Sequence, residues 1–404
     1  MNPREVLLRI HGAALAAVAG DAVVHRWLRA HPDRHWHAIV ALGKAAEQMA
    51  AGALEALRAR GLRPPTLVIT KALMGRLQAD TSIRLLESDH PIPGAASLAA
   101  GGALLDFIAA QPADARLLFL LSGGASALVE VPAPGVDLAL LERCNQWLLG
   151  SGLPIDGVNA VRRRLSALKG GGLLRMLGGR AAEVLLISDV AGDDPAVIGS
   201  GPLWPSPPPP LPTRLPQWLR KALPPARPTH ARPPPHHRVA DLRQALEGAA
   251  QEGHRLGLPV HLDPEPLAGD ARQEGETFAR RLCQGPPGLH VKGGETTVEL
   301  PPRPGRGGSN QHLALAAAQV LAGDTRCLVL AAGTDGSDGP TEAAGALVDG
   351  GTLARGCRRG LDPDQALAAA DAGTFLAASG DLVITGPTGT NVTDLLLGLK
   401  LDDP

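Results

Sequence analysis

The 404-residue chain is poor in aromatic side chains and almost without net charge. It contains no Tyr and only four Phe, so platforms on which nucleic-acid bases could stack are scarce. A formal net charge of −1 removes the general electrostatic case for binding nucleic acid or an anionic membrane. No run reaches the roughly 20 apolar residues of a membrane span. With 44% hydrophobic and 20% charged residues, the composition is that of an ordinary enzyme with small-molecule partners.

Cysteines are few and scattered, at positions 144, 283, 327 and 357. Because no Cys-x-x-Cys pair occurs, we expect neither a disulfide framework nor a zinc site, and we expect a reducing compartment. Near the N-terminus, Glu5, Arg9 and His11 interrupt an apolar run whose apolar residues follow helical spacing. This pattern favours an amphipathic helix over a signal peptide, and hence a cytoplasmic protein.

Several catalytic motifs are also missing. The lack of Gly-x-x-x-x-Gly-Lys-Ser/Thr excludes a P-loop NTPase. The lack of Gly-x-Gly-x-x-Gly weakens the interpretation as a nicotinamide-dependent dehydrogenase. No Gly-x-Ser-x-Gly or His-Glu-x-x-His motif occurs. His31, His35 and His37 lie among prolines and arginines, and we interpret them as solvated residues rather than metal ligands.

What the chain does contain is a repeated pattern of apolar runs of strand length. Each run ends in small, polar or charged residues: Ile39–Leu42 before Gly43-Lys44, Leu117–Leu121 before Ser122-Gly123-Gly124, Val184–Ile187 before Ser188-Asp189, Cys327–Ala332 before Gly333, and Asp381–Thr385 before Gly386. Helical patterns follow most of them, which predicts the α/β class with mostly parallel sheets. Glycine-rich turns at strand ends let backbone N–H groups approach phosphate oxygens, so we expect a phosphate-rich ligand.

The length predicts two domains, and the alternation of strands and helices predicts that both are Rossmann-like, three-layer α/β domains. Prolines are concentrated between Pro202 and Pro235, and proline is incompatible with a core strand or a long helix. We therefore predict an N-terminal domain over residues 1–204, a stiff connector or surface loop over 205–235, and a C-terminal domain over 236–385. Within the loop, Trp218 and Leu219 are expected to pin a short helix. The segment from about 386 to 404 is expected to pack back on the first domain.

Two strand ends carry acidic residues. Asp189, Asp193 and Asp194 follow one predicted strand, and Asp335 and Asp338 follow another. Carboxylates beside exposed backbone N–H groups suit a complex of Mg²⁺ and phosphate, and a solvated acidic turn is the alternative. We predict Asp189 as the functional carboxylate, because it is nearest its strand, and expect Asp193 and Asp194 to cap the next turn.

A basic stripe is the other feature with chemical content. A helix is predicted from Val158 to Lys169, with Gly170 and Gly171 at its end. Arg162, Ser166 and Lys169 then share one face, at i, i+4 and i+7. Such a stripe suits a small carboxylate or a phosphate, and a solvated basic face is the alternative.

Together these motifs resemble the glycerate 2-kinases of the MOFRL type along nearly the whole chain. The resemblance rests on Gly43-Lys44-Ala45, Ser88–Pro93, Leu121–Leu128, Val158–Gly171, Ile187–Pro202, Gly293–Val298, Gly333–Thr341 and Gly386–Asn391. It implies two α/β domains with the active site in the cleft between them. It also implies that ATP, with Mg²⁺, phosphorylates the 2-hydroxyl of D-glycerate, giving 2-phosphoglycerate and ADP. Some members carry the older name hydroxypyruvate reductase, so an NAD(P)H-dependent reductase is the alternative.

The resemblance places the family's catalytic Lys on Lys44. It also exposes a departure, because the family's Gly-Gly-Arg-Asn-Gln-Glu is here Gly307-Gly-Ser-Asn-Gln-His312. Ser309 cannot supply the charge of the missing Arg, and His312 replaces the Glu. Arg306 could substitute from a different angle; otherwise a weakly active or non-catalytic relative is expected.

The predicted site can now be stated in full. The catalytic residues are Lys44, Asp189 and Arg306, and the metal ligands are Asp189, Asp193 and Asp335. The substrate or phosphate ligands are Ser122, Gly123, Gly124, Ser126, Arg162, Ser166, Lys169, Asn310, Thr334 and Asp335. The expected partner is a small hydroxy acid, without nucleic acid or membrane, and both a homodimer and a monomer are open.

Overall fold

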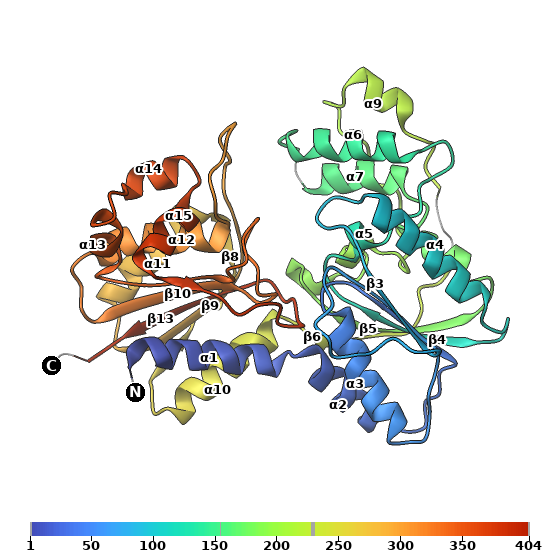
Figure 1. The fold of residues 1–404 in the computed structure, drawn as a ribbon, viewed down its shortest axis with the longest axis horizontal. Coiled ribbons are helices and arrows are strands. Elements are labelled where there is room, and N and C mark those ends of the chain that lie inside the picture. The colour runs from blue at the N-terminus through green and yellow to red at the C-terminus, as the bar shows by residue number, and fades with distance from the viewer. Residues whose placement is uncertain (1, 154, 228–230, 403–404) are drawn as a thin grey trace. The chain divides into compact units, whose positions relative to one another are not determined.

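A computed structural model describes residues 2–153, 155–227 and 231–402. The chain forms two compact units, each described by itself (Figure 1). Residues 20–240 make up the parallel-sheet unit, and residues 2–19 together with 241–402 make up the mixed-sheet unit. The predicted α/β class is confirmed.

Six parallel strands form the sheet of the parallel-sheet unit, in the order β3-β2-β1-β4-β5-β6. They are β1 (Ala38–Leu42), β2 (Thr66–Thr70), β3 (Ile83–Glu87), β4 (Arg116–Leu121), β5 (Ala181–Ile187) and β6 (His236–Ala240). The strands predicted from three of the apolar runs are confirmed as β1, β4 and β5. Because these three are parallel neighbours, their carboxyl ends lie side by side.

Helices cover both faces of this sheet. The longer ones are α2 (Gly20–Ala30), α3 (Ala46–Arg58), α4 (Ala95–Ala109), α6 (Leu138–Leu149) and α7 (Ile155–Leu165). Short elements are α5 (Ala125–Leu128), α8 (Gly172–Met176), η1 (Ala191–Asp193), η2 (Ile198–Ser200) and α9 (Gln217–Ala222). On one face, alternate strand residues such as Val40 and Phe119 pack with Leu104 and Ile108 of α4, while α3 packs on the other face. This gives the three predicted layers.

The proline-rich segment belongs to the parallel-sheet unit and is a surface loop rather than a connector. Its short helix α9 is held as predicted, because Leu219 is fully buried against Val161 and Leu165 of α7. Arginines of α7 fix the loop further: Arg163 donates to Ser206 O at 3.1 Å and Arg164 to Pro224 O at 2.6 Å. Residues 228–230 lie outside the described residues.

The mixed-sheet unit has strands in the order β12-β11-β10-β13-β9-β7, with β8 also paired to β9. They are β7 (Val260–Leu262), β8 (Leu267–Asp270), β9 (Gly288–Thr297), β10 (Cys327–Gly333), β11 (Gly345–Asp349), β12 (Leu382–Val383) and β13 (Asp394–Lys400). Among the described strands of this sheet, only β7 and β8 pair in parallel, both with β9. The prediction of mostly parallel sheets is therefore wrong here, because β10 turns into β11 without a crossover helix and β13 runs antiparallel between β10 and β9.

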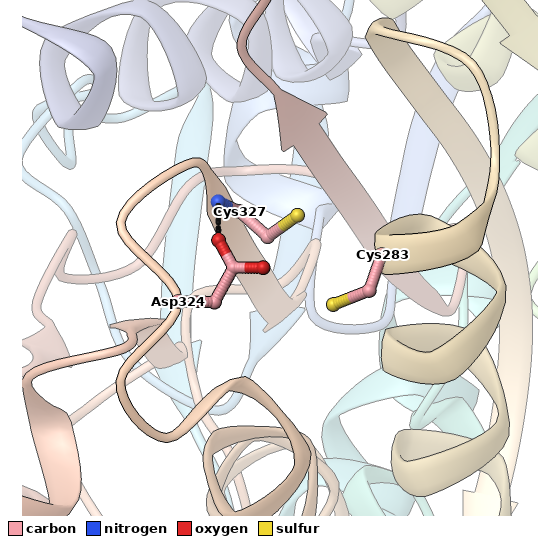
Figure 2. A group of neighbouring side chains, drawn as sticks. All are labelled: Cys283, Asp324 and Cys327. Atoms are coloured by element: carbon pink, nitrogen blue, oxygen red, sulfur yellow. Dashed lines mark hydrogen bonds between the residues drawn. The ribbon is translucent and has the colours of Figure 1, made fainter. Parts of the chain in front are cut away.

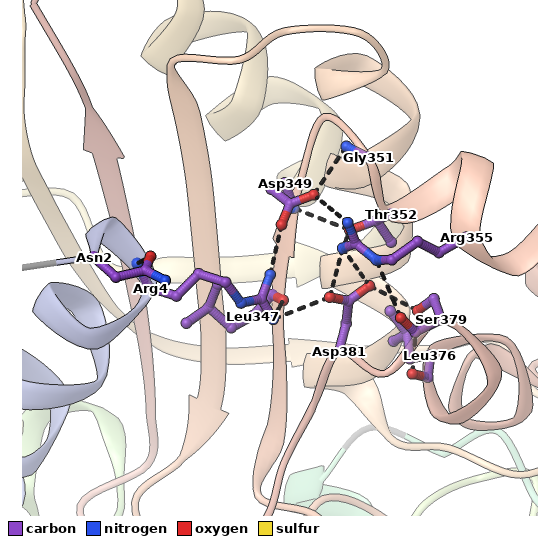
Figure 3. A network of polar contacts seen from close by, with 10 residues as sticks. All are labelled: Asn2, Arg4, Leu347, Asp349, Gly351, Thr352, Arg355, Leu376, Ser379 and Asp381. Atoms are coloured by element: carbon purple, nitrogen blue, oxygen red, sulfur yellow. Dashed lines mark hydrogen bonds and ion pairs between the residues drawn. The ribbon is translucent and has the colours of Figure 1, made fainter.

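Two layers of helices cover this sheet (Figure 1). One contains α1 (Pro3–Ala17) and α10 (Leu242–Arg255); the other contains α11 (Ala271–Gln284), α12 (Ser309–Leu321), α13 (Thr352–Cys357), α14 (Pro363–Ala368) and α15 (Ala372–Ser379). The predicted amphipathic N-terminal helix is α1, which buries Leu7, Ile10 and Ala14. Its Arg4 binds Asp349 at 2.6 Å and Asp381 at 3.0 Å, within an ion-pair network that includes Arg355 (Figure 3).

The unit boundaries differ from those predicted in three places. The N-terminal helix belongs with the later residues, and β6 completes the parallel sheet, so the mixed-sheet unit resumes at Asp241 instead of 236. The C-terminal segment supplies the central strand β13 of the mixed sheet instead of packing on the first domain, and residues 403–404 lie outside the described residues. In each case, strand pairing or an apolar helix face sets the boundary.

Among the described residues, one helical stretch, Pro3–Ala30, is long and apolar enough to cross a membrane by length and composition alone. Core helices pass the same test. This stretch consists of two separate helices, α1 and α2, that belong to different units.

Candidate active site

The turns that follow β1 and β4 form one hydrogen-bonded structure. Lys44 N–H donates to Gly123 O at 2.9 Å, and Ala45 N–H donates to Ser122 Oγ at 3.0 Å. Gly43 permits this approach, because its φ is +126° and a Cβ there would lie 2.2 Å from Ser122 Oγ. Ser122 is fully buried, so it shapes the turn.

Lys44 and His90 converge above Gly124. A Cβ at Gly124 would lie 3.1 Å from Lys44 Cγ and 3.3 Å from His90 Nε2, and the φ of Gly124 is +84°. Both constraints require glycine at this position. A lysine and a histidine whose side chains lie beside a glycine turn are suited to receiving an anion.

The loop after β5 separates the three predicted carboxylates. Asp189 lies just after β5, at the edge of the sheet where β4 reaches Ser122. Asp193 forms an ion pair with Arg238, and Asp194 Oδ1 accepts the Ala196 N–H at 2.9 Å. Capping is thus confirmed for Asp194 alone. A metal ion at Asp193 would have to displace a guanidinium, whereas Asp189 is the carboxylate nearest the end of β5.

The basic helix ends earlier than predicted, at Leu165. The Ser166 hydroxyl accepts the N–H groups of Leu168 and Lys169, at 3.1 and 3.3 Å, which replaces the helical pattern. Ser166 and Lys169 still come together, because both bind Glu130: Ser166 Oγ donates to Oε1 at 2.5 Å, and Lys169 Nζ forms a buried ion pair with Oε2.

Of Arg162 and Lys169, Arg162 is the one whose charge is not neutralised by a salt bridge among the described residues. A small cavity is lined by Ser126, Asn145, Arg162 and Lys169, among others. Arg162 Nε donates to Asn145 Oδ1 at 3.2 Å, and among the described residues its guanidinium has no salt bridge. Burial lowers its pKa, an effect that the Glu130 carboxylate opposes. A bound carboxylate would satisfy this half-buried cation.

In the mixed-sheet unit, carboxylates gather where β10 ends and β13 begins. A Cβ on Gly333 would lie 3.4 Å from Asp394 Oδ1 and 3.5 Å from Asp335 Oδ1. Burial raises the pKa of Asp394 to about 8, and the carboxylates of Asp338, Glu295 and Asp335 add to this effect. Hard oxygen atoms grouped in this way fit Mg²⁺, whose charge would favour the ionised carboxylates.

Asp338 fixes the start of α12. Its carboxylate accepts the N–H groups of Asn310 at 3.0 Å and Gln311 at 2.7 Å, and it also accepts from Asn310 Nδ2 at 3.4 Å. Burial raises the pKa of Asp338 to about 6, against the lowering effect of these hydrogen bonds. The predicted ligand Asn310 is therefore mainly a support for this carboxylate.

Thr334 also has a structural role. Its hydroxyl donates to Thr393 O at 2.6 Å and accepts the Val392 N–H at 2.8 Å, and the residue is fully buried. Neighbouring Asp335 differs, because it is half-buried and uses Oδ1 to accept the Ser337 N–H at 2.8 Å. Of this predicted pair, Asp335 is the one that can contact a ligand.

The residues that depart from the family motif lie in and just before α12. Arg306 is exposed, and its backbone N–H donates to Asp371 Oδ1 at 2.7 Å, which fixes its position in the turn. Ser309 is the first residue of α12. His312 is 7% exposed, its Nδ1 has no partner among the described residues, and burial lowers its pKa. A buried imidazole therefore stands where the family has Glu.

Sequence reasoning did not assign a role to His90, Glu130 or Asp394. His90 lies in a quoted motif, while Glu130 and Asp394 each adjoin apolar residues that are buried in the structure. For Glu130 and Asp394, a charged residue next to an apolar segment was the pattern that could have pointed to a role.

These features define a two-unit α/β protein with glycine-rich turns and charged groups at the ends of its strands. Two family models match it: "Domain of unknown function (DUF4147)" over residues 6–211 and "MOFRL family" over residues 288–394. D-glycerate 2-kinase of Thermotoga maritima is 35% identical over 89% of this chain and 90% of its own length. Glycerate 2-kinase of Pyrococcus horikoshii is 31% identical over 99% of this chain and 98% of its own length.

A third relative, from Agrobacterium vitis, is named "Putative hydroxypyruvate reductase" and is 34% identical over 98% of this chain and 94% of its own length. The crystal structure of glycerate kinase from T. maritima matches the fold with a TM-score of 0.81 at 32% identity, covering 98% of this chain and 99% of that one. The chain therefore belongs to the family of these glycerate 2-kinases.

Proposed function

We propose that this protein transfers the γ-phosphoryl group of ATP to the 2-hydroxyl of D-glycerate, giving 2-phosphoglycerate and ADP. The observation that carries the proposal is the position of Lys44 over the glycine turn at the ends of β1 and β4. There an ammonium group can stabilise charge on a transferring phosphoryl group, and bare backbone can approach phosphate oxygens. The names of the relatives make glycerate the first acceptor to test.

Two sets of residues serve this reaction in the proposal. From the parallel-sheet unit, Lys44 and the backbone of Gly123 and Gly124 bind phosphate, and Arg162 binds the glycerate carboxylate. From the mixed-sheet unit, Asp335 is the proposed Mg²⁺ ligand, and Asp189 is the candidate metal ligand of the parallel-sheet unit. When bound, Mg²⁺ would neutralise charge on the phosphates.

Arg306 supplies the second cation in this proposal. The family's Arg is replaced by Ser309, and the exposed guanidinium of Arg306 lies three residues earlier in a turn held by Asp371. A guanidinium matches the geometry of phosphoryl oxygens better than an ammonium group does. Without it, Lys44 alone would give only part of the stabilisation that phosphoryl transfer needs.

Steady-state assays on the full chain test the function directly. ADP release is followed with D-glycerate, ATP and Mg²⁺, and NADH oxidation is followed with hydroxypyruvate in a parallel reaction. We expect turnover only in the first reaction. Turnover of hydroxypyruvate with NADH, and none of glycerate with ATP, would replace the kinase with the reductase that the A. vitis name suggests.

Inactivity in both reactions would favour a non-catalytic relative that binds the same ligands. Calorimetric titration with ATP and Mg²⁺ then identifies such a protein. The proposal includes a cytoplasmic location, because scattered cysteines without a disulfide framework suit a reducing compartment.

A further inference from the structure

Two cysteines that are far apart in the chain meet in the mixed-sheet unit. Cys283 lies in the last turn of α11, and Cys327 is the first residue of β10. Asp324, in the loop before β10, joins them (Figure 2). One ligand atom from each of the three residues, two Sγ atoms and a carboxylate oxygen, all lie within 4.8 Å of one another.

From this arrangement we propose a binding site for a thiophilic divalent cation of the Zn²⁺ class, formed by Cys283, Asp324 and Cys327. A tetrahedral Zn²⁺ ion with bonds of about 2.3 Å to sulfur would bring the two Sγ atoms to about 3.8 Å from each other. Three protein ligands leave the fourth position to water.

The carboxylate is already held in a ligating orientation. Asp324 Oδ1 accepts the N–H groups of Arg326 at 2.7 Å and Cys327 at 3.1 Å. The other carboxylate oxygen is turned toward the side where the two sulfur atoms lie (Figure 2). The backbone therefore orients this ligand, as hydrogen-bond partners do around protein metal sites.

Access and local charge are both compatible with an ion. A cavity of about 410 Å³ reaches Asp324 and Cys327. The nearby cation, Lys400, is engaged elsewhere, because its Nζ donates to Cys283 O and Gly285 O at 2.7 Å each. Arg4, which also lines this cavity, is paired with Asp349 and Asp381.

The site requires proton release. Burial raises the pKa of Cys283 and raises that of Cys327 to about 12, with Asp324 acting in the same direction and Lys400 in the opposite one. Binding therefore converts two thiols to thiolates and releases two protons, so the apparent affinity should increase with pH.

This site is independent of the proposed kinase chemistry. Cys327 opens β10, whereas Asp335 follows the end of the same seven-residue strand, roughly 20 Å away. The geometry thus points to a structural or regulatory ion, separate from any Mg²⁺ of the reaction.

Titration of the full-length, reduced, metal-free protein with Co²⁺ tests the proposal. We expect one ion per chain, the intense d–d bands of tetrahedral cobalt, a thiolate charge-transfer band, and displacement by Zn²⁺. Zn²⁺ should also raise the thermal unfolding temperature, since a ligand of the native state stabilises it. Absence of the charge-transfer band would overturn the proposal.

Three variants localise the site. Cys283→Ser and Asp324→Asn should lose or weaken the cobalt spectrum, and Asp324→Asn keeps an acceptor for the two backbone N–H groups, which limits effects on folding. Cys357→Ser is the matched control, because Cys357 is an exposed thiol outside the site. An unchanged spectrum in Cys283→Ser, or its loss in folded Cys357→Ser, would contradict the assignment.

Discussion

The two sheets end in groups of opposite character. At the ends of β1 and β4, the parallel-sheet unit presents Lys44 and His90 over bare glycine backbone. At the junction of β10 and β13, the mixed-sheet unit presents Asp335 and Asp394 above Gly333. The first arrangement suits an anion and the second a hard cation. A kinase needs both, so the difference suggests a division of labour between the units.

The largest effect on kcat is expected from Arg306, the cation that the mixed-sheet unit supplies in the proposal. Arg306→Ala should lower kcat by about 10³-fold, the lower range for losing an arginine at a phosphoryl-transfer site. Ser309→Arg in the natural background should change kcat little, and in the Arg306→Ala background it should restore activity. Steady-state kinetics on the four proteins measure this. A kcat that rises strongly in Ser309→Arg alone would show that Arg306 does not compensate.

The second largest loss of kcat is expected at Lys44. Lys44→Met removes the ammonium group over Gly124, and we expect kcat to fall by about 10²- to 10³-fold with little change in thermal unfolding. Lys71→Met, at an exposed lysine in the loop after β2, is the control. Equal losses in both variants would indicate a general charge effect.

The acidic group should control the metal requirement. Asp335→Asn keeps an acceptor for Ser337, yet should raise the Mg²⁺ concentration for half-maximal rate at least tenfold, roughly the cost of disturbing a metal site. Asp189→Asn tests the same role in the parallel-sheet unit. If neither change alters the Mg²⁺ dependence, the metal assignment is wrong.

A smaller effect is expected at Arg162. Arg162→Ala should raise the KM for glycerate by about tenfold, corresponding to one charge-assisted hydrogen bond, with little change in kcat. Arg163→Ala, at the arginine bound to Ser206, is the matched control. An unchanged KM would show that another residue binds the carboxylate of glycerate.

The smallest effect on turnover should come from Asp394. Without a metal ion this carboxyl is mostly neutral below its pKa of about 8, and the proposal does not use it as a Mg²⁺ ligand, so Asp394→Asn should preserve most activity at pH 7. Stability should respond instead. Because the folded pKa lies above the unfolded value of 3.8, the carboxyl stabilises the fold at acid pH, and this contribution is lost as the pH rises from about 4 to 8.

The Asn variant should therefore show a flatter decline of unfolding temperature over that pH range. A decline identical to that of the natural protein would place the pKa of Asp394 near its ordinary value. That result would also weaken the description of this strand end as a crowded group of carboxylates.

The parts of the fold that could be predicted were those marked by a pattern of neighbouring residues in the sequence. Uninterrupted apolar runs predicted β1, β4, β5 and β10, because strands covered on both sides are apolar at every position. The direction of β10 relative to its neighbours carries no local signal. The last predicted strand, Asp381–Thr385, pairs only at Leu382 and Val383, which form β12, and the run that forms β13 was not predicted as a strand.

The site was predictable to the same extent. The glycine turns after β1 and β4 were predicted because glycine at a strand end has few structural substitutes, whereas the role of Lys44 comes from the family resemblance and stays a prediction. The stripe of Arg162, Ser166 and Lys169 was assigned to one helix, whereas it is Glu130, from another element, that brings Ser166 and Lys169 together. A buried partner of this kind has no fixed spacing in the sequence.

The sequence alone determined the α/β class, the family resemblance and the glycine turns, because each depends on residues close together in the chain. The tertiary structure decided which charges are already neutralised, such as Asp193 by Arg238 and Lys169 by Glu130. It also decided that Cys283 and Cys327 meet, although their spacing gave no metal motif. Ion pairs and ligand sets are set by distances in space, and those depend on how strands pair and helices pack.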